Sequence, residues 1–218
     1  MSSILKTDEI QSQNGGAVVK MQTLKHPSAS GNNLVLGSDG STTITNGTLS
    51  AGTIGSGVSG FGLITHADQW RYTTSFAGSG FLTITANFQQ VTSADSSSGG
   101  IGSGMTQDSG VFTFPATGIW LIMCKSTFQA TSGGILYAGL HIYVTTDNSS
   151  YTVRSTGYSN MDDSSYYQTH HNMYMFDCQD TTTHKVKFNV DVSNNSARFR
   201  GSSTHNYNEF TFIRLGDT

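Results

Sequence analysis

Charged side chains are scarce in this chain: they make up 11% of its 218 residues, against roughly a quarter in an ordinary globular domain. The 11 lysines and arginines form no basic stripe, and the formal net charge is -3. We therefore expect no nucleic-acid partner. Solubility depends instead on uncharged polar residues, chiefly Ser, Thr, Asn and Gln.

Long apolar runs are absent as well. No window approaches the roughly 20 apolar residues that a membrane-spanning helix needs, so we expect no membrane insertion. The N-terminal stretch carries a charge at Lys6 and has no apolar run beyond a few residues, which argues against a secretory signal peptide.

Cysteine is also rare. The only two, Cys124 and Cys178, each lie in an apolar, strand-like stretch. They would pair only if neighbouring strands brought them together, and nothing in their spacing demands that. Two buried free thiols are the simpler prediction.

The residues that are present fall into three segments, of which residues 1–33 are the first. A short apolar cluster is followed by a tight turn at Asn14–Gly16 and by a strand-like stretch at Ala17–Leu24. A hairpin of this size is marginal by itself in water. We therefore predict that this segment needs a partner, either other copies of the chain or a docking surface. The residues assigned to docking are Ile4, Leu5 and Ile10.

Residues 34–60 are rich in Gly, Ser and Thr and carry one aliphatic side chain per short turn. The spacing of these aliphatic residues fits neither a heptad nor a strand alternation. A single chain cannot bury them, but three copies can place them on a common axis. An unstructured linker is the alternative. We predict a thin trimeric β-type stalk whose core consists of Leu36, Ile44, Leu49, Ile54 and Val58.

Residues 61–218 are predicted to form a compact all-β head, because short β-type stretches recur between turn-rich pieces without a helical period. Lys185–Val192 alternates between an apolar and a polar face. Ile119–Cys124 is continuously apolar, as expected of a strand covered on both sides. We predict about ten strands: Gln69–Phe76, Phe81–Val91, Gly110–Phe114, Ile119–Phe128, Leu136–Thr145, Tyr151–Thr156, Tyr166–Cys178, Lys185–Val192, Ala197–Arg200 and Glu209–Leu215.

A signature within the head has the spacing found in the complement globular-head and tumour-necrosis-factor-like jelly-roll superfamily. Its residues are Phe112, Gly118, Trp120 and Ile122, and the closing stretch Phe210–Asp217 also resembles that superfamily. Trp120 and Ile122 stand where the superfamily usually has Tyr and Phe, and both suit a core. The resemblance implies an antiparallel jelly-roll sandwich that assembles as a homotrimer.

Four further stretches, co-linear along the chain, are similar to tail-fibre and collar proteins of marine bacteriophages. Ser3–Gln11 resembles their N-terminal motif, and three stretches resemble their head domain: Ala67–Arg71, Ile101–Thr106 and Ser109–Pro115. This resemblance implies a homotrimeric virion protein, assembled in the host cytoplasm, whose N-terminus docks on another virion protein. It does not distinguish a tail location from a capsid location.

In the jelly-roll superfamily one sheet packs its second face against neighbouring copies. A strand at that interface should therefore be apolar or aromatic on both alternations. Tyr166–Phe176 comes close, because one alternation carries Tyr166, Tyr174 and Phe176. The other alternation is predicted to lie at the threefold interface through Tyr167, Met173 and Met175.

No arrangement of residues points to catalysis, so we predict that the protein is not an enzyme and binds no cofactor. There is no G-x-S-x-G elbow and no evident pair of acids for cleaving glycans. His170 and His171 point to opposite faces of a strand, although three copies of one of them could converge on a threefold axis. Asp147, Asp162 and Asp163 lack the spacing of a calcium loop. We therefore predict no metal site.

Recognition is the function that remains. Aromatic side chains beside polar loops suit contacts with a host cell-surface glycan or protein. The leading hypothesis is a homotrimeric phage tail fibre whose head attaches to the host surface. A capsid- or collar-attached decoration or cement fibre is the alternative, and a glycan hydrolase is disfavoured by the missing acid pair. The candidate receptor contacts are Tyr151, Tyr158, Asn160, Asp162 and Tyr166.

Overall fold

The computed structural model describes residues 23–24, 34–36, 42–44, 64–92 and 99–218. The chain divides into two units, residues 1–58 and 59–218. In the first unit, three short antiparallel strands are ordered β1 (Thr23–Leu24), β2 (Leu34–Leu36) and β3 (Thr42–Ile44). Leu36 and Ile44 of the predicted stalk lie in β2 and β3, whereas Ile4, Leu5, Ile10, Leu49, Ile54 and Val58 lie outside the described residues.

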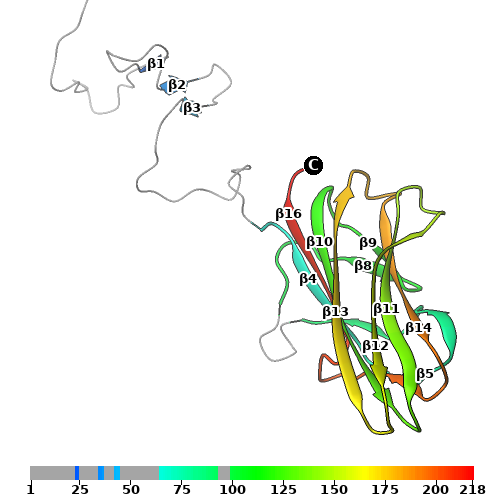
Figure 1. Cartoon of the computed structure of the whole chain (residues 1–218). Coiled ribbons are helices and arrows are strands. Elements are labelled where there is room, and N and C mark those ends of the chain that lie inside the picture. Colours follow the sequence, from blue (N-terminus) through cyan, green and yellow to red (C-terminus); the bar gives the residue numbers. More distant parts are fainter. Residues whose placement is uncertain (1–22, 25–33, 37–41, 45–63, 93–98) are drawn as a thin grey trace, which may run out of the picture. The chain divides into compact units, whose positions relative to one another are not determined.

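The second unit is a sandwich of two antiparallel sheets (Figure 1). The first, called here the β10 sheet, contains β4 (Ala67–Tyr72), β5 (Phe76–Ala77), β7 (Phe88–Gln90), β10 (Gly118–Ala130), β13 (Tyr167–Cys178), β15 (Ala197–Phe199) and β16 (Glu209–Gly216). The second, the β11 sheet, contains β6 (Gly80–Thr83), β8 (Thr106–Asp108), β9 (Val111–Thr113), β11 (Ile135–Thr145), β12 (Thr152–Met161) and β14 (Lys185–Val192).

Apart from the consecutive pairs β8–β9 and β11–β12, neighbouring strands in these sheets are not consecutive in the sequence. The β10 sheet is ordered β5-β15-β10-β16-β4-β7, with β13 paired to β10, and the β11 sheet is ordered β12-β11-β14-β9-β8, with β6 paired to β14. The described residues form no helix, so this part of the chain has no helix that could cross a membrane. The prediction of an all-β head is confirmed.

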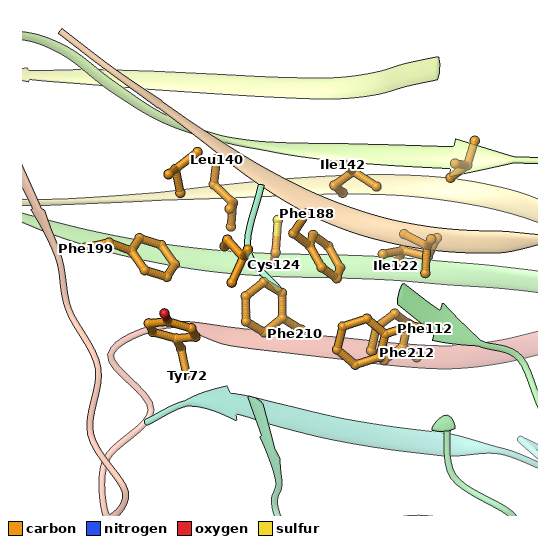
Figure 2. Packing of buried hydrophobic residues seen from close by; sticks show 14 of the residues in the cluster. Tyr72, Phe112, Ile122, Cys124, Leu140, Ile142, Phe188, Phe199, Phe210 and Phe212 are labelled. Atoms are coloured by element: carbon orange, nitrogen blue, oxygen red, sulfur yellow. The ribbon is translucent and has the colours of Figure 1, made fainter. Parts of the chain in front are cut away.

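The core consists of aromatic and aliphatic side chains between the two sheets (Figure 2). Successive strand residues point to opposite faces, and the predicted alternation in β14 is confirmed, because Val186, Phe188, Val190 and Val192 are buried. Phe188 lies with its ring centroid 4.4 Å from that of Phe210 on the opposite sheet. The largest fully buried side chains include Phe112, Phe114, Trp120, Phe128, Phe199, Phe210 and Phe212.

The residues of the jelly-roll signature described above lie in the core or beside it. Phe112, Trp120 and Ile122 are fully buried, and Trp120 Nε1 donates to Ala116 O at 3.1 Å. Gly118 has φ +136°, and a Cβ there would collide with Gly216 O and the Arg214 guanidinium. Only glycine fits this position, since its conformation and its neighbours both exclude a side chain.

The stretches Ala67–Arg71 and Ile101–Thr106 meet around a buried carboxylate, that of Asp68. Its oxygens accept hydrogen bonds from Trp70 Nε1 at 2.7 Å, Gln90 Nε2 at 2.9 Å and the Met105 backbone N at 2.7 Å. A buried carboxylate is tolerated when donors satisfy its oxygens. Asp68 thereby joins β4 to β7 and to the segment that precedes β8.

Three strand predictions need correction. Gln69–Phe76 is divided between β4 and β5, and Phe81–Val91 is divided between β6 and β7, which belong to different sheets. The second division occurs because the chain turns at Asn87, whose φ is 64°. With β8, which the sequence did not indicate, the described head has thirteen strands, β4 to β16, rather than about ten.

The two cysteines are buried free thiols, as predicted. In the register of β10 and β13, Cys178 lies opposite Gly118, whereas Cys124 lies opposite Asn172. Six residue steps at about 3.3 Å separate these two positions along the strands, far beyond the Cα separation that a disulfide spans. Burial raises the pKa of Cys124 to about 12 and that of Cys178 to about 11.

We expect neither thiol of the native protein to react with a maleimide at neutral pH, because both are buried and protonated. In denaturant under non-reducing conditions, both should react. Intact-mass spectrometry before and after unfolding measures this. Rapid labelling of the native protein, or an unfolded chain that labels only after reduction, would contradict the assignment.

Candidate functional site

The outer face of the β10 sheet exposes a row of thioether and aliphatic side chains. Met173 and Met175 of β13 are 62% and 63% exposed. In register, Met175 lies beside Leu121 of β10, which lies beside Ile213 of β16. Met173 lies likewise beside Met123. This surface, formed by Leu121, Met123, Met173, Met175 and Ile213, is called here the methionine face.

The polar end of the same sheet face is neutralised within the chain. Lys125 Nζ lies 3.0 Å from Glu209 Oε2, one strand away from His171. Further along, the exposed ring of Tyr167 lies 5.7 Å from the Arg200 guanidinium. The methionine face is thus bordered by a compensated ion pair and has no cluster of like charges.

The structure places the predicted interface strand as β13, but divides its side chains differently from the prediction. Phe176 is buried and Tyr174 packs against the core, whereas Tyr166 precedes the strand and is exposed. Tyr167, Met173 and Met175 all point outward. Ile119–Cys124 is not covered on both sides within one chain, because Leu121 and Met123 are only half-buried.

The five candidate receptor contacts do not gather at one place. Tyr151 lies just before β12, where its ring is 4.1 Å from Lys187 Nζ. Asn160 Nδ2 donates to Asp162 Oδ1 at 3.3 Å at the other end of that strand. Ten residues in a strand span about 33 Å, so these two sites are separate. Tyr158 points outward from the middle part of β12.

An aromatic cluster on the outer face of the β11 sheet was not foreseen from the sequence. Tyr158 meets Tyr137 edge-on, with ring centroids 5.8 Å apart, and meets His141 at 5.0 Å. Phe81 lies 5.5 Å from His141 and 5.9 Å from Tyr143. The ring side chains at positions 137, 141 and 143 of β11 could have been recognised from the sequence as one outward alternation. Only the register of the sheet brings Phe81 and Tyr158 beside them. We call Phe81, Tyr137, His141, Tyr143 and Tyr158 the aromatic face.

A Ser–His pair is present, but its surroundings do not suit catalysis. His170 Nε2 lies 2.7 Å from Ser126 Oγ and accepts from the Leu140 backbone N at 3.2 Å. Ser126 is fully buried, and His170 Nδ1 has no hydrogen-bond partner among the described residues. A nucleophile needs access to substrate and a base oriented by a third group. The pair therefore joins β10, β11 and β13 instead.

Asp147, one of the residues considered as a calcium ligand, uses its carboxylate in hydrogen bonds within its own loop. Asp147 Oδ1 accepts hydrogen bonds from Thr145 Oγ1 and from the backbone N of Ser149 and Ser150. These bonds, that from Ser150 foremost, hold the pKa of Asp147 well below its usual range. Within the described part of the chain, no three His, Cys, Asp or Glu residues cluster in a way that could hold a metal ion.

Burial, together with His141 and His171, lowers the pKa of His170 to about 4. In the neutral state His170 Nε2 accepts a hydrogen bond from the Leu140 backbone N–H. Protonation of Nε2 would replace this bond by two N–H groups that face each other. In the unfolded chain the pKa is near 6.5, so acidification from pH 6.5 to 4 protonates the unfolded state first and favours it. Stability should therefore fall across this window.

We expect His170→Gln to make the fall in unfolding temperature between pH 6.5 and 4 shallower. Part of the dependence of unfolding temperature on pH should remain in this variant, because burial also lowers the pKa values of His66 and His141. His205→Gln, in an exposed loop, is the matched control and should leave the slope unchanged. The readout is calorimetry at one protein concentration across the pH series. Equal slopes for wild type and His170→Gln would contradict the assignment.

Of the comparisons with known proteins, the one with solved structures agrees with this architecture. No family model matches the chain, and no curated protein sequence matches it. Among solved structures, murine APRIL at pH 5.0 is similar with a TM-score of 0.50 and 12% identity, covering 69% of this chain and 98% of that one. Eiger TNF from S. frugiperda has a TM-score of 0.47 and 10% identity, covering 70% and 93%. The likeness to APRIL establishes the fold alone: the head is a tumour-necrosis-factor-like jelly roll.

Proposed function

We propose that this protein is a homotrimeric phage virion fibre whose jelly-roll head mediates attachment to the host surface. The observation that carries the homotrimer in this proposal is the exposed methionine face on one sheet of the sandwich. Contiguous apolar surface on a soluble domain marks an interaction site. Its occupant is proposed to be two further copies of the same chain.

The chemistry of this face suits self-association. Thioether side chains adapt to an irregular apposing surface, and rows of Met, Leu and Ile offer apolar area whose removal from water is favourable. Lys125 and Glu209 neutralise each other beside it, so this pair adds no like-charge repulsion to the approach of a second copy. The tumour-necrosis-factor-like fold is compatible with such an assembly.

The virion assignment is supported by the sequence resemblance of Ser3–Gln11 and of the three head stretches to phage fibre and collar proteins. Attachment by three heads on one stalk would let weak individual contacts add up through effective concentration. A decoration or cement fibre on the capsid or collar is the second candidate. It is favoured by the same resemblance, which does not separate tail from capsid.

The double variant Met173→Glu/Met175→Glu is expected to dissociate the trimer, since six carboxylates would be forced into one apolar interface. The mass measured by sedimentation should be three times the 23.3 kDa of one chain for the wild type and 23.3 kDa for the variant. Leu136→Glu is the control, because Leu136 is 84% exposed on the other sheet. A wild type that is monomeric at micromolar concentration would contradict the proposal; a variant that stays trimeric would place the association elsewhere.

Location on the particle is tested by electron microscopy of virions labelled with a gold-tagged antibody against residues 61–218. Label on the tail, with competition of the purified full-length protein against phage adsorption, is the expected result. Label over the capsid, without such competition and with loss of particle stability on removal of the protein, would favour the decoration fibre. An absence of label on any particle would overturn the virion assignment.

A further inference from the structure

The aromatic face of the β11 sheet contains a hollow. Tyr137, Tyr158 and Asp191 line a shallow, open depression of about 390 Å³. The two tyrosine rings meet at 89° and are 39% and 50% exposed. Tyr158 OH donates to Asp191 Oδ2 at 3.0 Å. Three strands contribute to this hollow, because Tyr158 belongs to β12, Tyr137 to β11 and Asp191 to β14.

The hollow exists because of a glycine. Gly139 of β11 lies in register between Tyr158 and Asp191. A Cβ at Gly139 would come within 2.7 Å of Tyr158 Cδ1 and 2.6 Å of Gly157 O. The missing side chain therefore lets the Tyr158 ring lie across β11 and reach Asp191 on the far strand.

The groups around the hollow specify the chemistry of an occupant. None of the three lining residues is cationic, and one is a carboxylate, so an anionic ligand is disfavoured. Lys187, on the same strand as Asp191, lies over the Tyr151 ring instead. Because Tyr158 OH donates to Asp191, the pair presents lone pairs outward. Ring faces that pack on C–H groups, beside acceptors that take O–H groups, match the two sides of a sugar ring.

A second observation also points to a hydroxyl-bearing ligand. His141 and Asn189 are 3% and 4% exposed and are directly opposed in register on this face. His141 Nε2 and Asn189 Oδ1 are buried, and neither has a hydrogen-bond partner among the described residues. Leaving buried polar atoms unpaired costs free energy. The rings of Tyr158 and Phe81, both about half exposed, pack against the His141 ring, so the unpaired His141 nitrogen lies directly beneath the aromatic face.

We propose that the aromatic face is a binding site for an uncharged saccharide, with Tyr137 and Tyr158 packing on the sugar ring and Asp191 accepting its hydroxyl protons. The proposal rests on the attachment function proposed above and gives the receptor its chemical class, a neutral glycan. The site lies on the flat side of the head rather than in the loops. A quaternary ammonium group, which aromatic rings and a carboxylate can also attract, is the competing ligand.

The test uses the full-length protein and ligand-observed saturation-transfer NMR. The probes are the methyl pyranosides of glucose, galactose, mannose and N-acetylglucosamine, with choline as the cationic probe. At least one pyranoside should bind with millimolar affinity. Asp191→Asn and Gly139→Ala should each weaken it at least tenfold, the first by removing the charged acceptor and the second by displacing Tyr158. Tyr207→Ala, an exposed tyrosine that precedes β16 of the other sheet, should bind as wild type does.

The outcomes separate this proposal from the attachment function. Binding of choline without any pyranoside, or no binding of either, would overturn the saccharide site, as would binding unaffected by Asp191→Asn in a variant with a wild-type melting curve. Pyranoside binding by a protein that does not compete for phage adsorption would leave the site in place and overturn attachment. Competition that persists undiminished with Tyr158→Ala would leave attachment in place and overturn this site as its receptor contact.

Discussion

The burial of one aromatic core between two sheets is the constraint on which the rest of the head depends. Phe112, Phe188, Phe210 and Phe212 come from β9, β14 and β16 and meet between the sheets (Figure 2). A strand has only two faces, so each strand that contributes to this core has a single face left for anything else. The two surfaces proposed for interaction, the methionine face and the aromatic face, lie on those remaining faces.

The two outer faces differ in chemistry because the residues at the outward positions differ. On the β10 sheet they are Met, Leu and Ile, which have little to offer a polar ligand and much to gain from another protein surface. On the β11 sheet they are tyrosines, a histidine and an aspartate, which combine flat apolar area with hydrogen-bonding groups. Since the faces belong to different sheets, self-association through one leaves the other available to a ligand.

Buried polar side chains connect what the apolar core alone would leave apart. Asp68 joins β4 to β7 and to the segment before β8, and His170 and Asn172 of β13 bond to the Leu140 backbone of the opposite sheet. Asn208, fully buried, bonds through its side chain to the backbone of Thr127 and Arg200. Such satisfied groups are costly to disturb, because losing one partner leaves the other unpaired in the interior.

The all-β class, the alternation of β14, the buried thiols and the outward pair Met173 and Met175 could be predicted from the sequence, because each follows from residue type and a period of two along one strand. The sequence could not place Asn87 at a crossing between sheets, nor separate Tyr151 from Asp162 by the length of β12. It also did not show that the residues of the aromatic face form one cluster. Phe81, Gly139, Tyr158 and Asp191 are adjacent only because β6, β14, β11 and β12 pair in that order. Strand order and register depend on contacts between segments far apart in the chain, so they are known from the folded structure and not from the pattern along one strand.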